Sequence, residues 1–167
     1  MRKEKRKEYA CDFETTMQVP VRVWAWGAYE VQTGAYQWGN DIQSFLEDFC
    51  RTGQTYYFHN LKFDGEFLVY YMLSHGYEVK SLDRSDKLTR KSFKPMIDDT
   101  GAWYSLEVKN AKGRRFQIKD SLKFVLGSIE SIAKQYGTTY EKGEIDYKKA
   151  RPAGYEPTPE EPCYLYK

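Results

Sequence analysis

Residues 9–16 read Tyr9-Ala10-Cys11-Asp12-Phe13-Glu14-Thr15-Thr16, a stretch with the character of a buried strand that carries two acids. Side chains two positions apart on a strand point to the same face of the sheet. We therefore expect Asp12 and Glu14 to lie side by side on one face, with Phe13 buried on the other. This stretch sets the first strand and the place where chemistry can occur.

Two neighbouring carboxylates repel one another, and each is pushed towards its neutral form unless a cation lies between them. A divalent ion such as Mg²⁺ or Mn²⁺, which prefers carboxylate and water oxygens, removes that conflict. On these two residues alone, an exposed strand end with two solvated acids is the simpler alternative. A metal site requires further ligands elsewhere in the chain.

The composition is that of a folded protein. The chain has 167 residues, enough for one domain with a sizeable core. Aromatic residues make up 17% of it, which argues against disorder even though 30% of the residues are charged. The net charge is only +2, so the whole-chain charge does not indicate a nucleic-acid-binding protein. Basic residues nevertheless gather in residues 2–7 and 109–123, which is a weak indication of contact with a polyanion.

Cysteine usage and hydropathy exclude several classes of protein. The cysteines lie far apart, show no metal-ligand spacing and are odd in number, which argues against a disulfide framework (Cys11, Cys50 and Cys163). The basic amino terminus is followed by Asp12 and Glu14 rather than by an apolar stretch, so we expect no secretory signal. No segment approaches the ~18 apolar residues of a membrane span. We therefore expect a cytoplasmic protein without a membrane partner.

Local patterns predict strands interleaved with helices. The expected strands, the first three forming an antiparallel meander, are 9–15, 21–27, 35–39, 54–59 and 116–120. The expected helices are 42–49 with Asn40 or Asp41 as its cap, 65–75 ended by Gly76, 128–136 ended by Gly137, and one that starts at 158–161. Residues 78–119 indicate a hairpin region with a turn at 110–113, together with a loop. This order implies an α/β fold, a mixed sheet with helices on its faces.

Two more polar clusters follow expected strands. An aromatic strand ends at Asn60, and Asp64 then starts the next helix as a natural cap. Asp120 and Ser121 stand at another strand end. A carboxylate at a strand end can be aimed into a cleft, although on these residues alone a helix cap at Asp64 and a turn residue at Asn60 are the favoured interpretation.

Taken together, these clusters resemble the exonuclease motifs of family B DNA polymerases. Asp12-Phe13-Glu14-Thr15 resembles the first motif (D-x-E), and Asn60-Leu61-Lys62-Phe63-Asp64 resembles the second. The context is similar to the protein-primed branch of small tailed bacteriophages and linear plasmids. The stretches that resemble this branch occur in the same order and span nearly the whole chain: 9–16, 23–25, 58–65, 120–123, 142–147 and 158–161.

The resemblance implies a ribonuclease H-like (DnaQ-like) α/β fold and a proofreading 3′→5′ exonuclease that uses two Mg²⁺ or Mn²⁺ ions. It implies that Asp12, Glu14 and Asp64 are metal ligands, and that Lys142, otherwise a solvated loop lysine, assists catalysis. The residues that it assigns to the single-stranded DNA 3′ end are Thr15, His59, Asn60, Phe63, Phe67, Ser121 and Leu122. For a phage or plasmid gene, the expected location becomes the cytoplasm of the host bacterium.

The third exonuclease motif of the family, Y-x-x-x-D, is incomplete in this sequence. Tyr164 is the best candidate for the tyrosine that orients the attacking water, and Tyr166 is the second. The partner aspartate would fall at or beyond position 168. We therefore expect residues 1–167 to be a single exonuclease domain that stops before this motif is complete and lacks polymerase motifs. We expect either a fragment of a longer polymerase or a short protein derived from one, with weakened metal binding and reduced activity.

Two alternatives remain open. The first is a catalytically weakened or inactive module that keeps the fold and binds single-stranded DNA or a protein partner. In the protein-primed branch, that partner is the terminal protein primer, and the polymerase domain follows in the same chain. An unrelated ribonuclease H-like nuclease acting on RNA is disfavoured, because the matched residues extend well beyond the carboxylates.

Overall fold

The computed structural model describes residues 6–138, 145–158 and 161. In this part of the chain one eight-stranded mixed sheet has the order β3-β2-β1-β4-β8-β7-β6-β5. The strands are β1 (Glu8–Thr15), β2 (Val23–Glu30), β3 (Tyr36–Gly39), β4 (Thr55–Phe58), β5 (Glu78–Val79), β6 (Ser92–Ile97), β7 (Trp103–Lys109) and β8 (Arg115–Asp120). The helical segments are the π-helix η1 (Ser44–Phe49), α1 (Leu61–Ser74), the 3₁₀ turn η2 (Ser121–Lys123) and α2 (Ile129–Tyr136). Among the described residues, no helix is both long and apolar enough to cross a membrane.

The centre of the sheet is built from strands that run in the same direction. β4 pairs in parallel with β1 on one side and with β8 on the other, with Cys11 opposite Phe58 and Phe58 opposite Asp120. The carboxyl ends of β1, β4 and β8 therefore meet at one edge of the sheet. In doubly wound and related α/β sheets this edge is where ligands bind.

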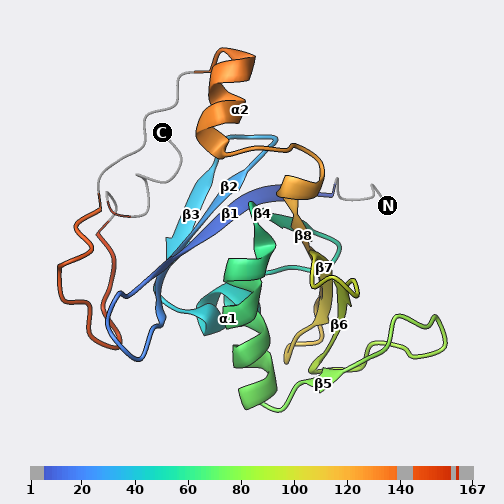
Figure 1. The fold of residues 1–167 in the computed structure, drawn as a ribbon. Helices are drawn as coiled ribbons and strands as arrows, with labels where there is room; N and C mark the ends of the chain where they lie inside the picture. The colour runs from blue at the N-terminus through green and yellow to red at the C-terminus, as the bar shows by residue number, and fades with distance from the viewer. Residues whose placement is uncertain (1–5, 139–144, 159–160, 162–167) are drawn as a thin grey trace.

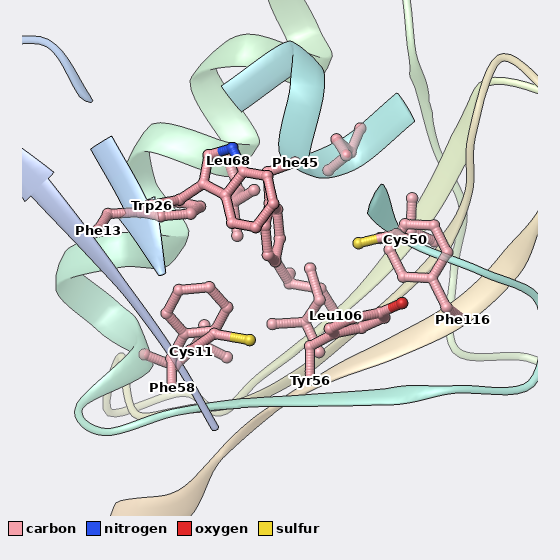
Figure 2. Packing of buried hydrophobic residues seen from close by; sticks show 14 of the residues in the cluster. Cys11, Phe13, Trp26, Phe45, Cys50, Tyr56, Phe58, Leu68, Leu106 and Phe116 are labelled. Carbon is pink, nitrogen blue, oxygen red and sulfur yellow. The ribbon is translucent and has the colours of Figure 1, made fainter. Parts of the chain in front are cut away.

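Aromatic side chains fill the space between the sheet and the helices that cover one face of it (Figures 1 and 2). Phe45 of η1 is fully buried, and its ring lies 5.2 Å from that of Phe13 and 5.7 Å from that of Phe58. Leu68 and Met72 bring α1 against the same cluster. The odd-numbered residues of β1 face this core, so the even-numbered residues face away from it, as the alternation predicted.

The predicted α/β mixed sheet is confirmed, including the antiparallel pairing of β1, β2 and β3. The helix at 42–49 is also confirmed, because residues 42 and 43 are α-helical ahead of η1, and Asp41, which precedes them, accepts a hydrogen bond through its Oδ1 from Ser44 N at 2.6 Å. The expected start of the next helix at residue 65 is wrong. Asn60 adopts a left-handed conformation (φ 65°), and α1 begins directly after it. Asp64 therefore lies inside the first turn of α1 and is not its cap.

The predicted turn at 110–113 is confirmed, and hydrogen bonds attach it to η1. Asn110 is fully buried. Its Nδ2 donates to Leu46 O at 2.8 Å, and its Oδ1 accepts from Lys112 N and Arg114 N at 3.1 and 3.0 Å. One side chain thus closes the turn between β7 and β8 and attaches it to η1. The expected start of a helix at 158–161 falls largely outside the described residues.

We expect Asn110→Ala to lower the free energy of unfolding by about 1–3 kcal/mol. The substitution leaves Leu46 O and two turn N–H groups without their partner, and buried polar groups are costly when unpaired. Urea unfolding would measure the change, with Gln37→Ala as the matched control because Gln37 is an exposed amide on the edge strand β3. An Asn110→Ala variant as stable as the control would contradict this account of the turn.

Candidate active site

Asp12 and Glu14 lie on the face of β1 that points away from the aromatic core. In the antiparallel ladder Asp12 is opposite Gly27 and Glu14 is opposite Ala25, so both acids face small residues on β2. Directly opposite residues share a face of the sheet, and these partners leave room above the two carboxylates. Glu14 is nevertheless buried, and Asp12 is half-buried.

Asp64 brings a third carboxylate to the same strand from the first turn of α1. Its Oδ1 accepts a hydrogen bond from Phe13 N at 3.3 Å, and the residue is only 3% exposed. Burial, followed by the negative charges of Asp12 and Glu14, raises the pKa of Asp64 from its ordinary value of 3.8 to about 8. The three acids are therefore close enough to oppose one another's ionisation, which is the conflict that a cation would relieve.

The donor set is suitable for hard divalent cations, because carboxylate oxygens are the ligands that Mg²⁺ and Mn²⁺ prefer. Within residues 6–138, 145–158 and 161, however, no three His, Cys, Asp or Glu side chains converge tightly enough to enclose an ion. The acids are thus neighbours without forming a closed cage in this structure. Lys142 and Tyr164, which the resemblance assigns to catalysis, lie outside the described residues.

Asp120 joins the ends of β4 and β8 at this edge. The residue is 2% exposed, and its Oδ1 accepts hydrogen bonds from Asn60 N at 3.1 Å and from Leu122 N at 2.9 Å. One carboxylate oxygen therefore holds both the left-handed turn before α1 and the 3₁₀ turn after β8. Sequence reasoning placed Asp120 at a strand end but gave it no role. The sequence signal that could have indicated a role for Asp120 was its position immediately before Ser121 and Leu122.

His59 and Ser121, both predicted to contact DNA, lie against one another. The His59 Nδ1 is 3.1 Å from Ser121 Oγ, and its Nε2 is 2.8 Å from Gly127 O. A carbonyl oxygen only accepts hydrogen bonds, so Nε2 carries a proton and donates a hydrogen bond to Gly127 O. The imidazole thereby fixes the loop between β8 and α2 beside the end of β4.

Two phenylalanines of α1 and the last residue of β1 complete the predicted set. Phe63 is 52% exposed, and its ring is 5.6 Å from that of Phe67 in an edge-to-face arrangement. Thr15 ends β1, one residue beyond Glu14. The structure thus places the predicted DNA-contacting residues on the carboxyl-terminal ends of β1, β4 and β8 and on the first turns of α1.

Tyr147 is a site residue that sequence reasoning missed, although it lies in one of the stretches that carried the resemblance. Tyr147 is 45% exposed, but its hydroxyl interacts with the Glu14 carboxylate, and its pKa is raised by partial burial and then by the charges of Glu14 and Asp12. No local sequence pattern predicts this contact, because it joins the segment after α2 to the first strand. Tyr147 extends the site towards the carboxyl-terminal part of the chain.

Comparison with known proteins identifies the family. The family described as "DNA polymerase type B, organellar and viral" matches residues 47–166. The chain belongs to this family. Among its relatives in the type B polymerases are the DNA polymerases of Bacillus phages PZA and phi29, each 38% identical over 166 residues. The matched region is 96% of this chain and 28% of each relative. The DNA polymerase of Streptococcus phage Cp-1 is 27% identical over 89% of the chain.

Solved structures of a type B polymerase share the fold. Phi29 DNA polymerase complexed with primer-template DNA matches with a TM-score of 0.81 and 35% identity, over 96% of this chain and 29% of that one. Phi29 DNA polymerase complexed with single-stranded DNA matches with a TM-score of 0.80. The resemblance to the polymerases of small tailed phages is confirmed. The chain spans a little over a quarter of the length of these relatives.

Proposed function

We propose that this type B polymerase chain is a 3′→5′ proofreading exonuclease domain that hydrolyses the terminal phosphodiester of single-stranded DNA. The observation that carries the proposal is the placement of Asp64 beside Asp12 and Glu14. These acids come from two elements, and burial of Asp64, followed by the charges of Asp12 and Glu14, raises the pKa of Asp64 to about 8. A fold rarely gathers buried carboxylates without a cation or a proton to share, and active sites are where such groups concentrate.

Asp12, Glu14 and Asp64 would hold the divalent cations, Mg²⁺ or Mn²⁺. A bound pair of such ions supplies an activated water and stabilises charge on the leaving 3′ oxygen. The chain's own residues position these ligands: β1 fixes two carboxylates on one face, and the Phe13 N–H holds the third. We assign to Lys142 an assisting role near the phosphate, and to Tyr164 the orientation of the attacking water.

The surroundings of the acids fit a frayed 3′ end. Phe63 and Phe67 offer aromatic faces on which bases stack without sequence readout, each contact worth ~1–3 kcal/mol. His59, Asn60, Ser121 and Leu122 lie at the adjoining strand ends, where polar groups and backbone can contact sugar and phosphate. A relative solved in complex with single-stranded DNA supports the assignment. In the full-length protein, we propose a polymerase domain in the same chain and a terminal protein primer as a partner.

The test is digestion of a 5′-labelled single-stranded oligonucleotide by the whole chain with Mg²⁺ or Mn²⁺. We expect stepwise shortening from the 3′ end, lost in the Asp12→Ala/Glu14→Ala double variant because it removes the two acids of β1. The matched control, Asp83→Ala/Asp86→Ala, removes one exposed and one half-buried carboxylate between β5 and β6 and is expected to retain digestion.

The other readings give different results in the same assay. Oligonucleotide binding that is equal in wild type and double variant, with digestion by neither, would favour a binding module. Faster digestion of an RNA oligonucleotide than of its DNA counterpart would favour a ribonuclease. Digestion that persists in the double variant would contradict the proposed site.

A further inference from the structure

A buried arginine fixes the segment that follows α2. The Arg151 side chain is only 3% exposed, and its guanidinium lies 3.9 Å above the centre of the Trp24 ring. Such stacking of a guanidinium on an aromatic face is strongest when it is shielded from water. In Figure 1 this segment, coloured orange-red, runs past the loop between β1 and β2.

Trp24 is available for this contact because the β1–β2 pairing has a bulge beside Glu14 of the candidate active site. Glu14 pairs with Ala25 and Thr15 pairs with Val23, so Trp24 is skipped in the ladder. A bulge of this kind re-aims a side chain. Trp24 is fully buried but is not a member of the described aromatic core, and its ring instead contacts the Arg151 guanidinium and the Tyr155 ring.

The guanidinium is also held by directed polar contacts. Its Nη2 donates to Glu161 Oε1 at 3.0 Å, and its Nη1 donates to the carbonyl oxygens of Asp146 and Lys149 at 2.9 and 3.4 Å. Glu161 in turn accepts from the Tyr155 hydroxyl at 2.6 Å. A planar, multidentate donor of this kind suits Arg and not Lys.

These contacts reach the active site through one residue. Arg151 binds the carbonyl of Asp146, which directly precedes Tyr147 in the chain, and Tyr147 interacts with Glu14. The other end of the anchor is Trp24, next to Ala25, which pairs with Glu14. The guanidinium is thus connected to Glu14 by two routes, one through the β1–β2 ladder and one through the later segment.

We propose that Arg151 is a positioning residue of the exonuclease: clamped between Trp24 and Glu161, it holds residues 145–158 against β2 so that Tyr147 stays beside Glu14. This inference rests on the proposed function for its role in turnover. The anchoring itself is a property of the chain that can be measured without any activity.

Cleavage by a lysine-specific protease tests the anchoring. Lys148 and Lys149 are exposed on the anchored segment. We expect Arg151→Ala to speed cleavage after these lysines about tenfold or more, because local opening governs cleavage of a folded chain. Arg151→Lys should be intermediate. Arg115→Ala, which removes an exposed arginine paired with Glu107, should cleave as wild type does. Unchanged cleavage after Lys148 and Lys149 in Arg151→Ala would overturn the proposal.

Turnover tests the positioning. We expect Arg151→Ala to lower kcat about tenfold with little change in KM, because displacing a site group by ~1 Å costs rate more than binding. If Arg151 acts through Tyr147, the Arg151→Ala/Tyr147→Phe double variant should be no slower than the slower single variant. A double variant whose loss of kcat equals the product of the two single losses would overturn the positioning role of Arg151. A wild-type chain without digestion would count against the proposed function, whereas the cleavage pattern would still decide the anchoring.

Discussion

An Asp64→Asn variant is expected to be more stable than the wild type in metal-free solution at pH 8, and to lose exonuclease turnover. The pKa of Asp64 is about 8 in the folded chain against an ordinary value of 3.8. Between these values the folded state keeps a proton that the unfolded chain has released. The free energy of unfolding of the wild type therefore falls as pH rises from about 4 to about 8.

The size of this fall is on the order of 2–4 kcal/mol, given 1.36 kcal/mol per pKa unit and some relaxation of the coupled acids. Asparagine does not titrate, and its Oδ1 can still accept the hydrogen bond from Phe13 N. The variant should therefore keep at pH 8 most of the stability that it has at pH 5. The same substitution removes one of the proposed ligand charges, so digestion should drop by about 10³-fold or more.

Urea unfolding at pH 5 and pH 8 with a chelator would measure the first effect, with the exposed Asp99→Asn as the matched control. The control should follow the wild-type pH dependence. At pH 8, added Mg²⁺ should raise the free energy of unfolding of the wild type more than that of Asp64→Asn, since a ligand that binds only the folded state stabilises it. Parallel pH curves for wild type and Asp64→Asn would contradict the shared burial of the three acids.

The first strand could be predicted because its two signals agree. The alternation in residues 9–16 places Phe13 in the core, and that leaves Asp12 and Glu14 together on the other face. The antiparallel meander followed from β-prone runs separated by short turns. The helix over 42–49 followed from its apolar spacing, but the same spacing fits a π-helix, so the local winding was not predictable.

The start of α1 was misplaced for a physical reason. An aspartate before an apolar helical run is the usual sign of a cap, and Asp64 gives that sign. The helix instead starts at Leu61 because Asn60 takes the left-handed conformation while its N–H is held by Asp120. That partner is 60 residues away in sequence. The Arg151–Trp24 contact is hidden in the same way, since it depends on a bulge that local patterns do not reveal.

Asp120→Ala is expected to weaken binding of a single-stranded 3′ end about 10- to 100-fold, which corresponds to ~1.4–2.7 kcal/mol. The Asp120 carboxylate acts through the protein backbone, because it accepts hydrogen bonds from Asn60 N and Leu122 N. Without it, two N–H groups lose their acceptor, at a cost of ~1–3 kcal/mol. The left-handed Asn60 also loses the bond that holds its strained conformation.

Asp120→Asn is the informative partner of this change, because its Oδ1 remains an acceptor at the same place. Anisotropy of a labelled oligonucleotide, measured with a chelator so that no digestion occurs, should show near wild-type binding for Asp120→Asn and weak binding for Asp120→Ala. Equal losses in both variants would mean that the negative charge, and not the pair of accepted hydrogen bonds, supports the site. The expected difference follows from geometry alone: one oxygen sets the spacing between the turn that starts α1 and the turn that follows β8.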